Sequence, residues 1–329
     1  MPGISQKLRR LCGMRYNARM KSIAIFLAFL LFLPAAAGAI TAESYVLVDK
    51  DSFSIVDGKD YHRPLPPAST TKVLTAILAL EKLGEQDCVV PTKDVLSIPA
   101  SKLGLVPGRL YTVIDLVTGA LVNSANDAAF ALAVAMAGSE KEFADLMNEK
   151  AHEIGATDSH FENASGLYLP GHRTSAYDLA LIFRYALANK RFDEIMGTRY
   201  FTFDNGNGEV RHKNHNRLLF CFAPSIGGKT GYTVLSRHCY VGAFEKDGKT
   251  YILALLGSRN LWGDAVSILK KVYAEVPTER EIALAKWTHI GPSPSIRATA
   301  VSYHVAKRHV VRARYRHARR LRRVRVHGA

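Results

Sequence analysis

The chain has 329 residues, of which 48% are hydrophobic and 22% are charged, and its formal net charge is +15 at pH 7. This composition excludes a disordered or low-complexity protein, and the length is sufficient for one large domain with a complete core. The excess charge lies at the two ends, because residues 1–21 contain six Lys/Arg, residues 306–329 contain ten, and neither stretch contains an acid. The nearly neutral body between them does not indicate a nucleic-acid-binding protein.

Residues 1–39 are predicted to be a secretion signal. A basic stretch ends at Lys21, an apolar run covers residues 23–33, and small residues precede a cleavage site after Ala39. The apolar run is short for a bilayer span, so cleavage is favoured over an uncleaved membrane anchor. We therefore expect export across the inner membrane and a periplasmic location, with membrane association left open.

Residues 40–288 are predicted to form one domain, and residues 289–329 a Pro/Ser linker followed by an Arg-rich tail. The tail at 306–329 carries spaced apolar residues among its arginines, which is typical of a basic helix that lies on an anionic membrane surface. The alternative is a disordered basic tail held by any polyanion. Behind a secretion signal, nucleic acid is an unlikely partner.

Cysteine and histidine do not indicate a metal or a disulfide framework. The expected mature chain has Cys88, Cys221 and Cys239, an odd number, of which the last two lie in apolar surroundings and are predicted core residues. The sequence does not decide whether two of these cysteines form a disulfide bond. The histidines lack metal-ligand spacing and are assigned to the surface or the polar core, so no metal and no cofactor is expected.

Three short motifs carry most of the chemical information. The first is Ser69-Thr70-Thr71-Lys72, an S-x-x-K pattern followed by apolar residues at helical spacing. This pattern places Ser69 at the start of a helix, with its Oγ and the Lys72 amine one turn apart on one face. Free N–H groups at a helix start also favour a developing oxyanion.

The second motif is Ser124-Ala125-Asn126, which lies at the junction between two predicted helices, Val113–Val122 and Ala128–Ala137. The third is Lys229-Thr230-Gly231, at the start of a predicted strand pair. The partner strands are predicted at Tyr240–Phe244 and Tyr251–Leu256, with a turn at Asp247-Gly248. Each motif alone is weak, since Ser69 could be a helix cap and Lys229 a surface lysine, but all three in this order favour a serine acyltransferase.

The chain resembles the low-molecular-weight penicillin-binding proteins, the D-alanyl-D-alanine carboxypeptidase family. The likeness runs from about Ser44 to Ala274 and includes four further segments: Ser44–Asp49, Phe161–Leu167, Ser175–Ala180 and Asn214–Leu219. The resemblance implies an α/β (α+β) fold of the β-lactamase/transpeptidase type. In this fold a mainly antiparallel sheet is built from both ends of the chain, helices flank it, a helical region is inserted, and the site lies between them.

The resemblance also implies a role for each motif residue. Ser69 is the nucleophile, Lys72 the general base with a lowered pKa, and Ser124 the group that passes a proton to the leaving amine. Substrate binding is assigned to Asn126 for the substrate backbone, to Lys229 and Thr230 for the terminal carboxylate, and to the N–H groups of Ser69 and Tyr232 for the oxyanion. Gly231, the last residue of the third motif, is also assigned to substrate binding.

The implied function is a serine D,D-carboxypeptidase that removes the terminal D-Ala from peptidoglycan stem peptides and is acylated by β-lactams. The alternatives are a D,D-endopeptidase acting on cross-links, a β-lactamase using Glu162 as a second base, and a non-catalytic wall-binding protein. Two positions depart from the family pattern. Ala125 replaces a glycine and is small enough to fit, and Ser236-Arg237 replaces Ala-Gly, which changes size and charge near the site.

Overall fold

The structure is a computed structural model that describes residues 39–285 and 296–297. The predicted secretion signal and the basic tail lie outside the described residues. Within the described part of the chain, no helix is both long and apolar enough to cross a membrane.

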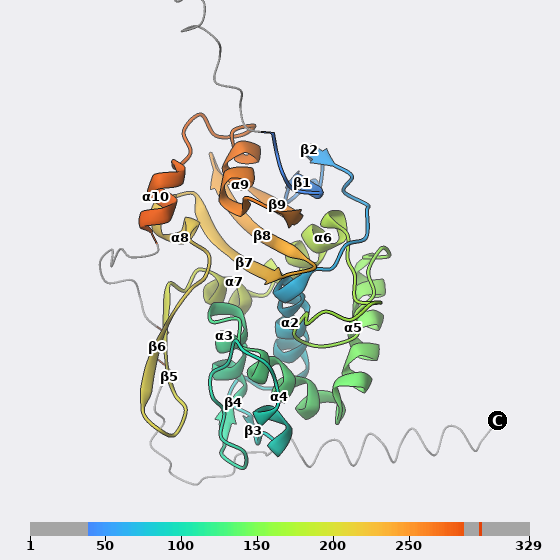
Figure 1. The fold of residues 1–329 in the computed structure, drawn as a ribbon, viewed down its shortest axis with the longest axis vertical. Coiled ribbons are helices and arrows are strands. Elements are labelled where there is room, and N and C mark those ends of the chain that lie inside the picture. The colour runs from blue at the N-terminus through green and yellow to red at the C-terminus, as the bar shows by residue number, and fades with distance from the viewer. Residues whose placement is uncertain (1–38, 286–295, 298–329) are drawn as a thin grey trace, which may run out of the picture. The chain divides into compact units, whose positions relative to one another are not determined.

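A five-stranded antiparallel sheet forms one half of the described fold (Figure 1). In sheet order its strands are β2 (Ile55–Lys59), β1 (Ser44–Asp49), β9 (Lys249–Ser258), β8 (Arg237–Lys246) and β7 (Ser225–Thr233). The first strand, β1, therefore pairs with β9 from the other end of the domain, with Ser44 opposite Leu256, as predicted. The turn between β8 and β9 is also as predicted: Asp247 and Gly248 have positive φ angles of 52° and 75°, the conformation that a two-residue hairpin requires.

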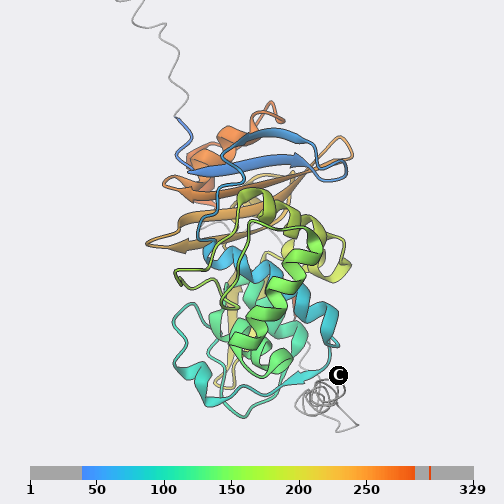
Figure 2. The ribbon, with the colours of Figure 1, turned by 90° about the vertical axis from the view of Figure 1, so that its right-hand side faces the viewer.

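Alternate residues of the sheet face two different layers. In β1, Tyr45 and Leu47 pack with the apolar face of α9 (Leu261–Leu269), whereas Val46 and Val48 belong to the core shared with the helical region. Successive side chains of a strand point to opposite faces of the sheet, so each face of β1 is buried by a different layer. Figure 2 shows the sheet between these layers.

The helical region is inserted between β2 and β7. Its helices are η1 (Ala68–Thr71), α2 (Lys72–Lys82), η2 (Lys93–Leu96), α3 (Val113–Val122), α4 (Asn126–Ala137), α5 (Glu140–Ile154), α6 (Ala176–Leu187), α7 (Lys190–Met196) and α8 (Leu218–Cys221). After the sheet, α10 (Glu279–Leu284) follows α9.

Two small sheets complete the described structure. One pairs β3 (Cys88–Val89) with β4 (Tyr111–Thr112), and the other has the order β10 (Ile296–Arg297), β5 (Tyr200–Asp204), β6 (Glu209–Lys213). The topology confirms the predicted antiparallel sheet with an inserted helical region.

Helix α2 places the first motif between the sheet and the helical region. Its first eight residues, from Lys72 to Ala79, are all buried, so this part of the helix is enclosed on all sides. The short 3₁₀ helix η1 precedes it directly and carries Ser69. The predicted helix start at Ser69 is thus confirmed, with one 3₁₀ turn before the α-helix.

A loop at residues 163–167 closes over η1. Gly166 has a φ angle of +80°, and a Cβ added there would lie 1.8 Å from the carbonyl oxygen of Ala68. Asn163 holds the loop in place, because its Oδ1 accepts hydrogen bonds from the backbone N–H groups of Ser165 and Gly166 at 3.1 and 2.7 Å. Only glycine fits this approach of two backbones.

We predict that Gly166→Ala lowers the free energy of unfolding by more than about 2 kcal/mol, because the added methyl group meets backbone and not a mobile side chain. Gly108→Ala is the matched control, since Gly108 has a φ angle of +84° but open space around it. The control should lose only about 1 kcal/mol, from the left-handed backbone alone. Urea denaturation of both variants measures the difference, and equal losses would contradict the close approach.

Candidate active site

The first motif places a serine hydroxyl beside a lysine amine. The Lys72 Nζ lies 3.0 Å from the Ser69 Oγ, because η1 and the first turn of α2 bring residues three apart in the chain onto one face. Ser69 is partly exposed, and Lys72 is fully buried. The predicted pairing of these two side chains is confirmed.

The surroundings of Lys72 favour a neutral amine that faces the serine. Burial, and after it the charge of Lys229, hold the pKa of Lys72 well below its usual range. Besides Ser69, the Nζ has two hydrogen-bond acceptors, the Asn126 Oδ1 and the Ser165 carbonyl oxygen, both at 2.7 Å. A neutral amine has two N–H bonds and one lone pair. If the two carbonyl groups take the N–H bonds, the lone pair points to Ser69.

The second and third motifs meet on the other side of the cleft. The Lys229 Nζ donates hydrogen bonds to the Ser124 Oγ at 2.9 Å and to the Thr230 carbonyl oxygen at 2.7 Å. Lys229 is 1% exposed, and burial lowers its pKa to about 7. Ser124 has a positive φ angle of 60°, which turns the chain between α3 and α4 and directs the side chain toward Lys229.

Asn126 lies in the first turn of α4, two residues earlier than the predicted helix start. Both N–H bonds of its amide are used within the protein, by the carbonyl oxygens of Pro99 and Ala100 at 3.1 and 3.0 Å. Its Oδ1 already accepts from Lys72. A substrate N–H could therefore bind only to the second lone pair of that oxygen.

A cleft connects all three motifs. Its lining includes every predicted site residue except Lys72 and Lys229, which are buried behind it: Ser69, Ser124, Asn126, Thr230, Gly231 and Tyr232. A Cβ on Gly231 would lie 2.8 Å from the backbone N of Ser69, so β7 passes directly against the nucleophile. Among the described cleft-lining residues there is no Asp or Glu.

The lining also includes large or charged side chains that the sequence did not assign to the site, namely Arg217, His215, His238 and Trp262. The sequence assigns the histidines to the surface or the polar core, and His215 and His238 are surface residues within the cleft. The Arg217 guanidinium has no hydrogen-bond or ion-pair partner among the described residues. The available signal was its place in Asn214–Leu219, a segment already matched to the family.

The two departures from the family pattern leave the cleft intact. Ala125 is fully buried at the start of α4, and the turn at Ser124 is formed. Arg237 does not line the cleft. Its guanidinium forms an ion pair with Glu43, 3.1 Å away, so its charge is directed to the start of β1.

Glu162, the candidate second base of a β-lactamase, does not line the cleft either. Its side chain lies against Gly171, where an added Cβ would be 2.4 Å from the Glu162 Oε1. Its backbone N–H donates to the His172 Nδ1 at 3.1 Å, which makes this a structural contact behind the site. The position of Glu162 therefore disfavours direct activation of a hydrolytic water.

The described residues contain neither a disulfide bond nor a group of side chains placed to bind a metal ion. Cys88, Cys221 and Cys239 are all free, and burial raises the pKa of Cys239 to about 12, as expected for a core thiol. Across residues 39–285, no group of three or more His, Cys, Asp or Glu side chains is arranged to bind a metal ion.

Comparison with known proteins places this arrangement in one family. A family profile described as D-alanyl-D-alanine carboxypeptidase, peptidase family S11, matches residues 33–260. The D-alanyl-D-alanine carboxypeptidase DacB2 of Mycobacterium tuberculosis is 36% identical over 72% of this chain and 84% of its own length. DacC of Escherichia coli is 32% identical over 74% of this chain and 66% of its own length, and DacF of Bacillus subtilis is 32% identical over 66% and 57%.

Solved structures agree with this result and confirm the predicted fold. A D-alanyl-D-alanine carboxypeptidase from Mycobacterium tuberculosis has a TM-score of 0.68 and 35% identity, with 74% of this chain and 97% of that chain covered. A mutant of the Streptomyces K15 DD-transpeptidase has a TM-score of 0.68 and 27% identity, with coverage of 72% and 99%. From its profile match, its relatives and its fold, the chain belongs to the D-alanyl-D-alanine carboxypeptidase family of penicillin-binding serine peptidases.

Proposed function

We propose that this protein is a serine D,D-carboxypeptidase that removes the terminal D-Ala from peptidoglycan stem peptides through an acyl-enzyme on Ser69. The observation that carries the proposal is the Lys72 amine, which is buried, has a lowered pKa and lies 3.0 Å from the Ser69 Oγ. A lysine acts as a general base only when it is neutral at the working pH. The named relatives act on the D-alanyl-D-alanine terminus, which gives the substrate class.

Acylation begins when neutral Lys72 takes the proton of the Ser69 hydroxyl. The Oγ then attacks the carbonyl carbon between the two terminal D-alanines. The resulting oxyanion is stabilised by the backbone N–H groups of Ser69 in η1 and Tyr232 in β7, two segments that approach each other closely at Gly231. In acyl-transfer enzymes, one such donor contributes about 3 kcal/mol to the transition state.

Collapse of the tetrahedral intermediate requires a proton on the leaving amine. Ser124 is placed to deliver it, because its Oγ accepts from Lys229 and its own hydrogen is free to face the cleft. Lys229, with a pKa of about 7, can replace the transferred proton. Water then hydrolyses the acyl-enzyme, and no cofactor enters these steps. A β-lactam acylates Ser69 in the same way: its C–N ring bond breaks, and the nitrogen that takes the proton stays attached to the acyl group.

The terminal carboxylate of the substrate needs a cation that reaches the cleft. Lys229 is buried and does not line the cleft, whereas Arg217 and Thr230 do. We assign the direct contact to Arg217 together with Thr230, since a guanidinium binds a carboxylate with two parallel hydrogen bonds. Gly231 and Asn126 line the path of the peptide backbone.

The domain assignment remains part of the proposal. Residues 40–288 form the catalytic domain, residues 1–39 direct export to the periplasm and are removed, and residues 289–329 contain a linker and a basic tail. An anionic membrane surface is the partner whose chemistry suits the tail. Membrane binding by this tail would hold the enzyme near newly made peptidoglycan.

The test of the proposed function is mass spectrometry of muropeptides after digestion of intact peptidoglycan with purified residues 40–329. We expect pentapeptides to lose one alanine, and the Ser69→Ala variant to leave them unchanged. Loss of cross-linked dimers instead would make the protein an endopeptidase. Identical products with both proteins would overturn the proposal and favour a non-catalytic wall-binding protein.

Arg217 provides a second prediction. Arg217→Ala should raise KM for a D-Ala-D-Ala peptide by about 10- to 100-fold, because a charge-assisted carboxylate contact is lost. The peptide amidated at its C-terminus is the matched substrate. The wild-type enzyme should discriminate strongly between acid and amide, and Arg217→Ala should not. Undiminished discrimination in the variant would assign the carboxylate to another group.

A further inference from the structure

The turn that follows the third motif contains a residue in an unfavourable backbone conformation. Strands β7 and β8 are joined through Val234, Leu235 and Ser236, and Arg237 then opens β8 with a φ angle of 53°. A left-handed residue often completes a short hairpin turn of this kind, and glycine is strongly preferred there. An arginine at this position suggests that its side chain contributes something that glycine cannot.

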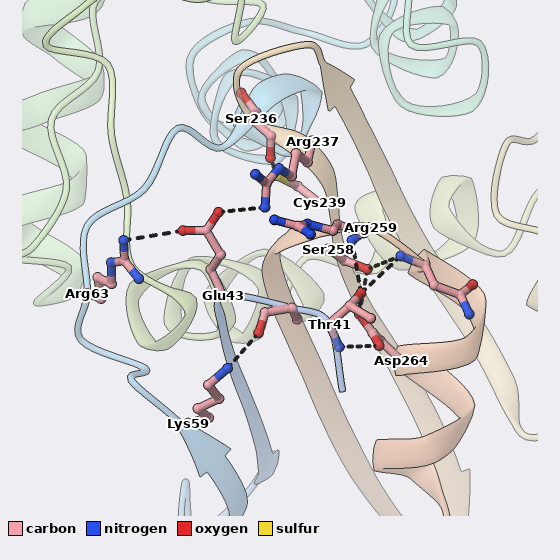
Figure 3. A network of polar contacts seen from close by, with 12 residues as sticks. Thr41, Glu43, Lys59, Arg63, Ser236, Arg237, Cys239, Ser258, Arg259 and Asp264 are labelled. Atoms are coloured by element: carbon pink, nitrogen blue, oxygen red, sulfur yellow. Dashed lines mark hydrogen bonds and ion pairs between the residues drawn. The ribbon is translucent and has the colours of Figure 1, made fainter. Parts of the chain in front are cut away.

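The Arg237 side chain shares one carboxylate with a second arginine. The Glu43 Oε1 lies 3.1 Å from Arg237 Nη1, and the Glu43 Oε2 lies 3.2 Å from Arg63 Nη2 (Figure 3). Glu43 is itself held by the sheet, because its backbone N–H donates to the Leu256 carbonyl oxygen at 3.1 Å. Gly257 leaves room for it, since a Cβ there would lie 2.9 Å from the Glu43 Cγ.

The two arginines lead to the two proposed oxyanion donors. Arg63 begins the segment Arg63-Pro64-Leu65-Pro66-Pro67 that precedes Ala68 and Ser69, and three prolines restrict its backbone. The Leu65 backbone pairs with Thr174, which fixes the middle of the segment. On the other side, Arg237 pairs with Thr233, the residue after Tyr232. Each ion pair of Glu43 therefore holds an arginine that a short, constrained segment connects to one of the two N–H donors.

The two segments also contact each other below the cleft. The Cys239 Sγ donates to the Pro66 carbonyl oxygen at 3.5 Å, and Gly231 approaches the Ser69 backbone N closely enough to exclude a Cβ. A small shift of β7 relative to η1 would therefore change the separation of the two N–H groups. Misplacement of catalytic groups by even 1 Å costs about 100-fold in rate.

We propose that Glu43, Arg63 and Arg237 form a clamp that fixes the relative position of the Ser69 and Tyr232 N–H groups. The inference rests on the proposed acyl-enzyme function. The three residues are positioning residues, since none of them lines the cleft. The side chains of Glu43, Arg63 and Arg237 are 31%, 54% and 38% exposed, so their ion pairs contribute little to global stability. Their effect is expected on the acylation step.

This difference gives the proposal a distinctive signature. Arg237→Gly introduces the residue that the backbone conformation prefers, so it should leave the melting temperature equal or higher. The same variant removes the ion pair between Glu43 and the start of β8, where Arg237 pairs with Thr233 of β7, so it should slow acylation. A residue with only a structural role would change rate and stability in the same direction.

The experiment measures acylation by a fluorescent penicillin in stopped flow, with the melting temperature of each protein. We expect Arg237→Gly and Glu43→Gln each to lower the limiting acylation rate constant about tenfold, with the preceding binding constant changed less than twofold. The double variant should be no slower than the slower single variant, because both changes break the same link. Arg259→Ala is the control, an exposed arginine on the same face without an ion pair to any described residue.

Rates within twofold of wild type in both single variants would overturn the clamp, as would additive losses in the double variant. An equal loss in Arg259→Ala would show that net charge, and not the clamp, controls the rate. If the wild-type protein is not acylated, or is labelled as well as Ser69→Ala, the proposed function itself fails. The two failures are therefore distinguishable in one data set.

Discussion

The burial of two lysines beside each other is the constraint on which this site depends. Lys72 and Lys229 are at most 1% exposed, and each would be costly to bury as an unpaired cation. The fold reduces this cost by supplying acceptors: Asn126 and Ser165 for Lys72, and Ser124 and Thr230 for Lys229. The remaining cost appears as lowered pKa values, which is the property that a catalytic base needs.

This constraint explains why the site lies where the sheet meets the helical region. Lys72 comes from the enclosed helix α2, and Lys229 comes from β7 at the edge of the sheet. Neither layer alone could exclude water from both amines. The loop that carries Ser165 completes the enclosure, and Gly166 allows it to approach η1 closely. The three motifs are distant in sequence because each lies on a different element that borders the cleft: η1 and α2, the α3–α4 junction, and β7.

The chemistry of the cleft is consistent with a substrate that ends in a carboxylate. Its described lining contains Arg217 and no acidic residue. The described lining also offers no carboxylate that could activate water, which a β-lactamase would need for rapid hydrolysis of the acyl-enzyme. A slow second step would leave the penicilloyl ester on Ser69, which is the behaviour expected of a penicillin-binding peptidase.

The sequence was sufficient for the features that depend on local pattern. Apolar spacing after Ser69 predicted α2, and Asp247-Gly248 predicted the β8–β9 turn, because helical period and turn conformation are local properties. Arg217 could not be placed, since only tertiary packing brings it beside β7. The direction of Arg237 was equally inaccessible, because its partner Glu43 lies 194 residues away. Sequence likewise could not show that both amide hydrogens of Asn126 are already bonded.

The central claim is that the buried Lys229 charge helps to keep Lys72 neutral. The most direct measurement is the pH dependence of Ser69 acylation by penicillin in the wild-type protein and in Lys229→Gln. The rate should rise with pH as the coupled lysine pair loses a proton. Because Lys229 lowers the pKa of Lys72, its removal should raise that pKa and move the rising limb to higher pH, whatever the loss in maximal rate. A limb that stays in place or moves to lower pH would contradict the account.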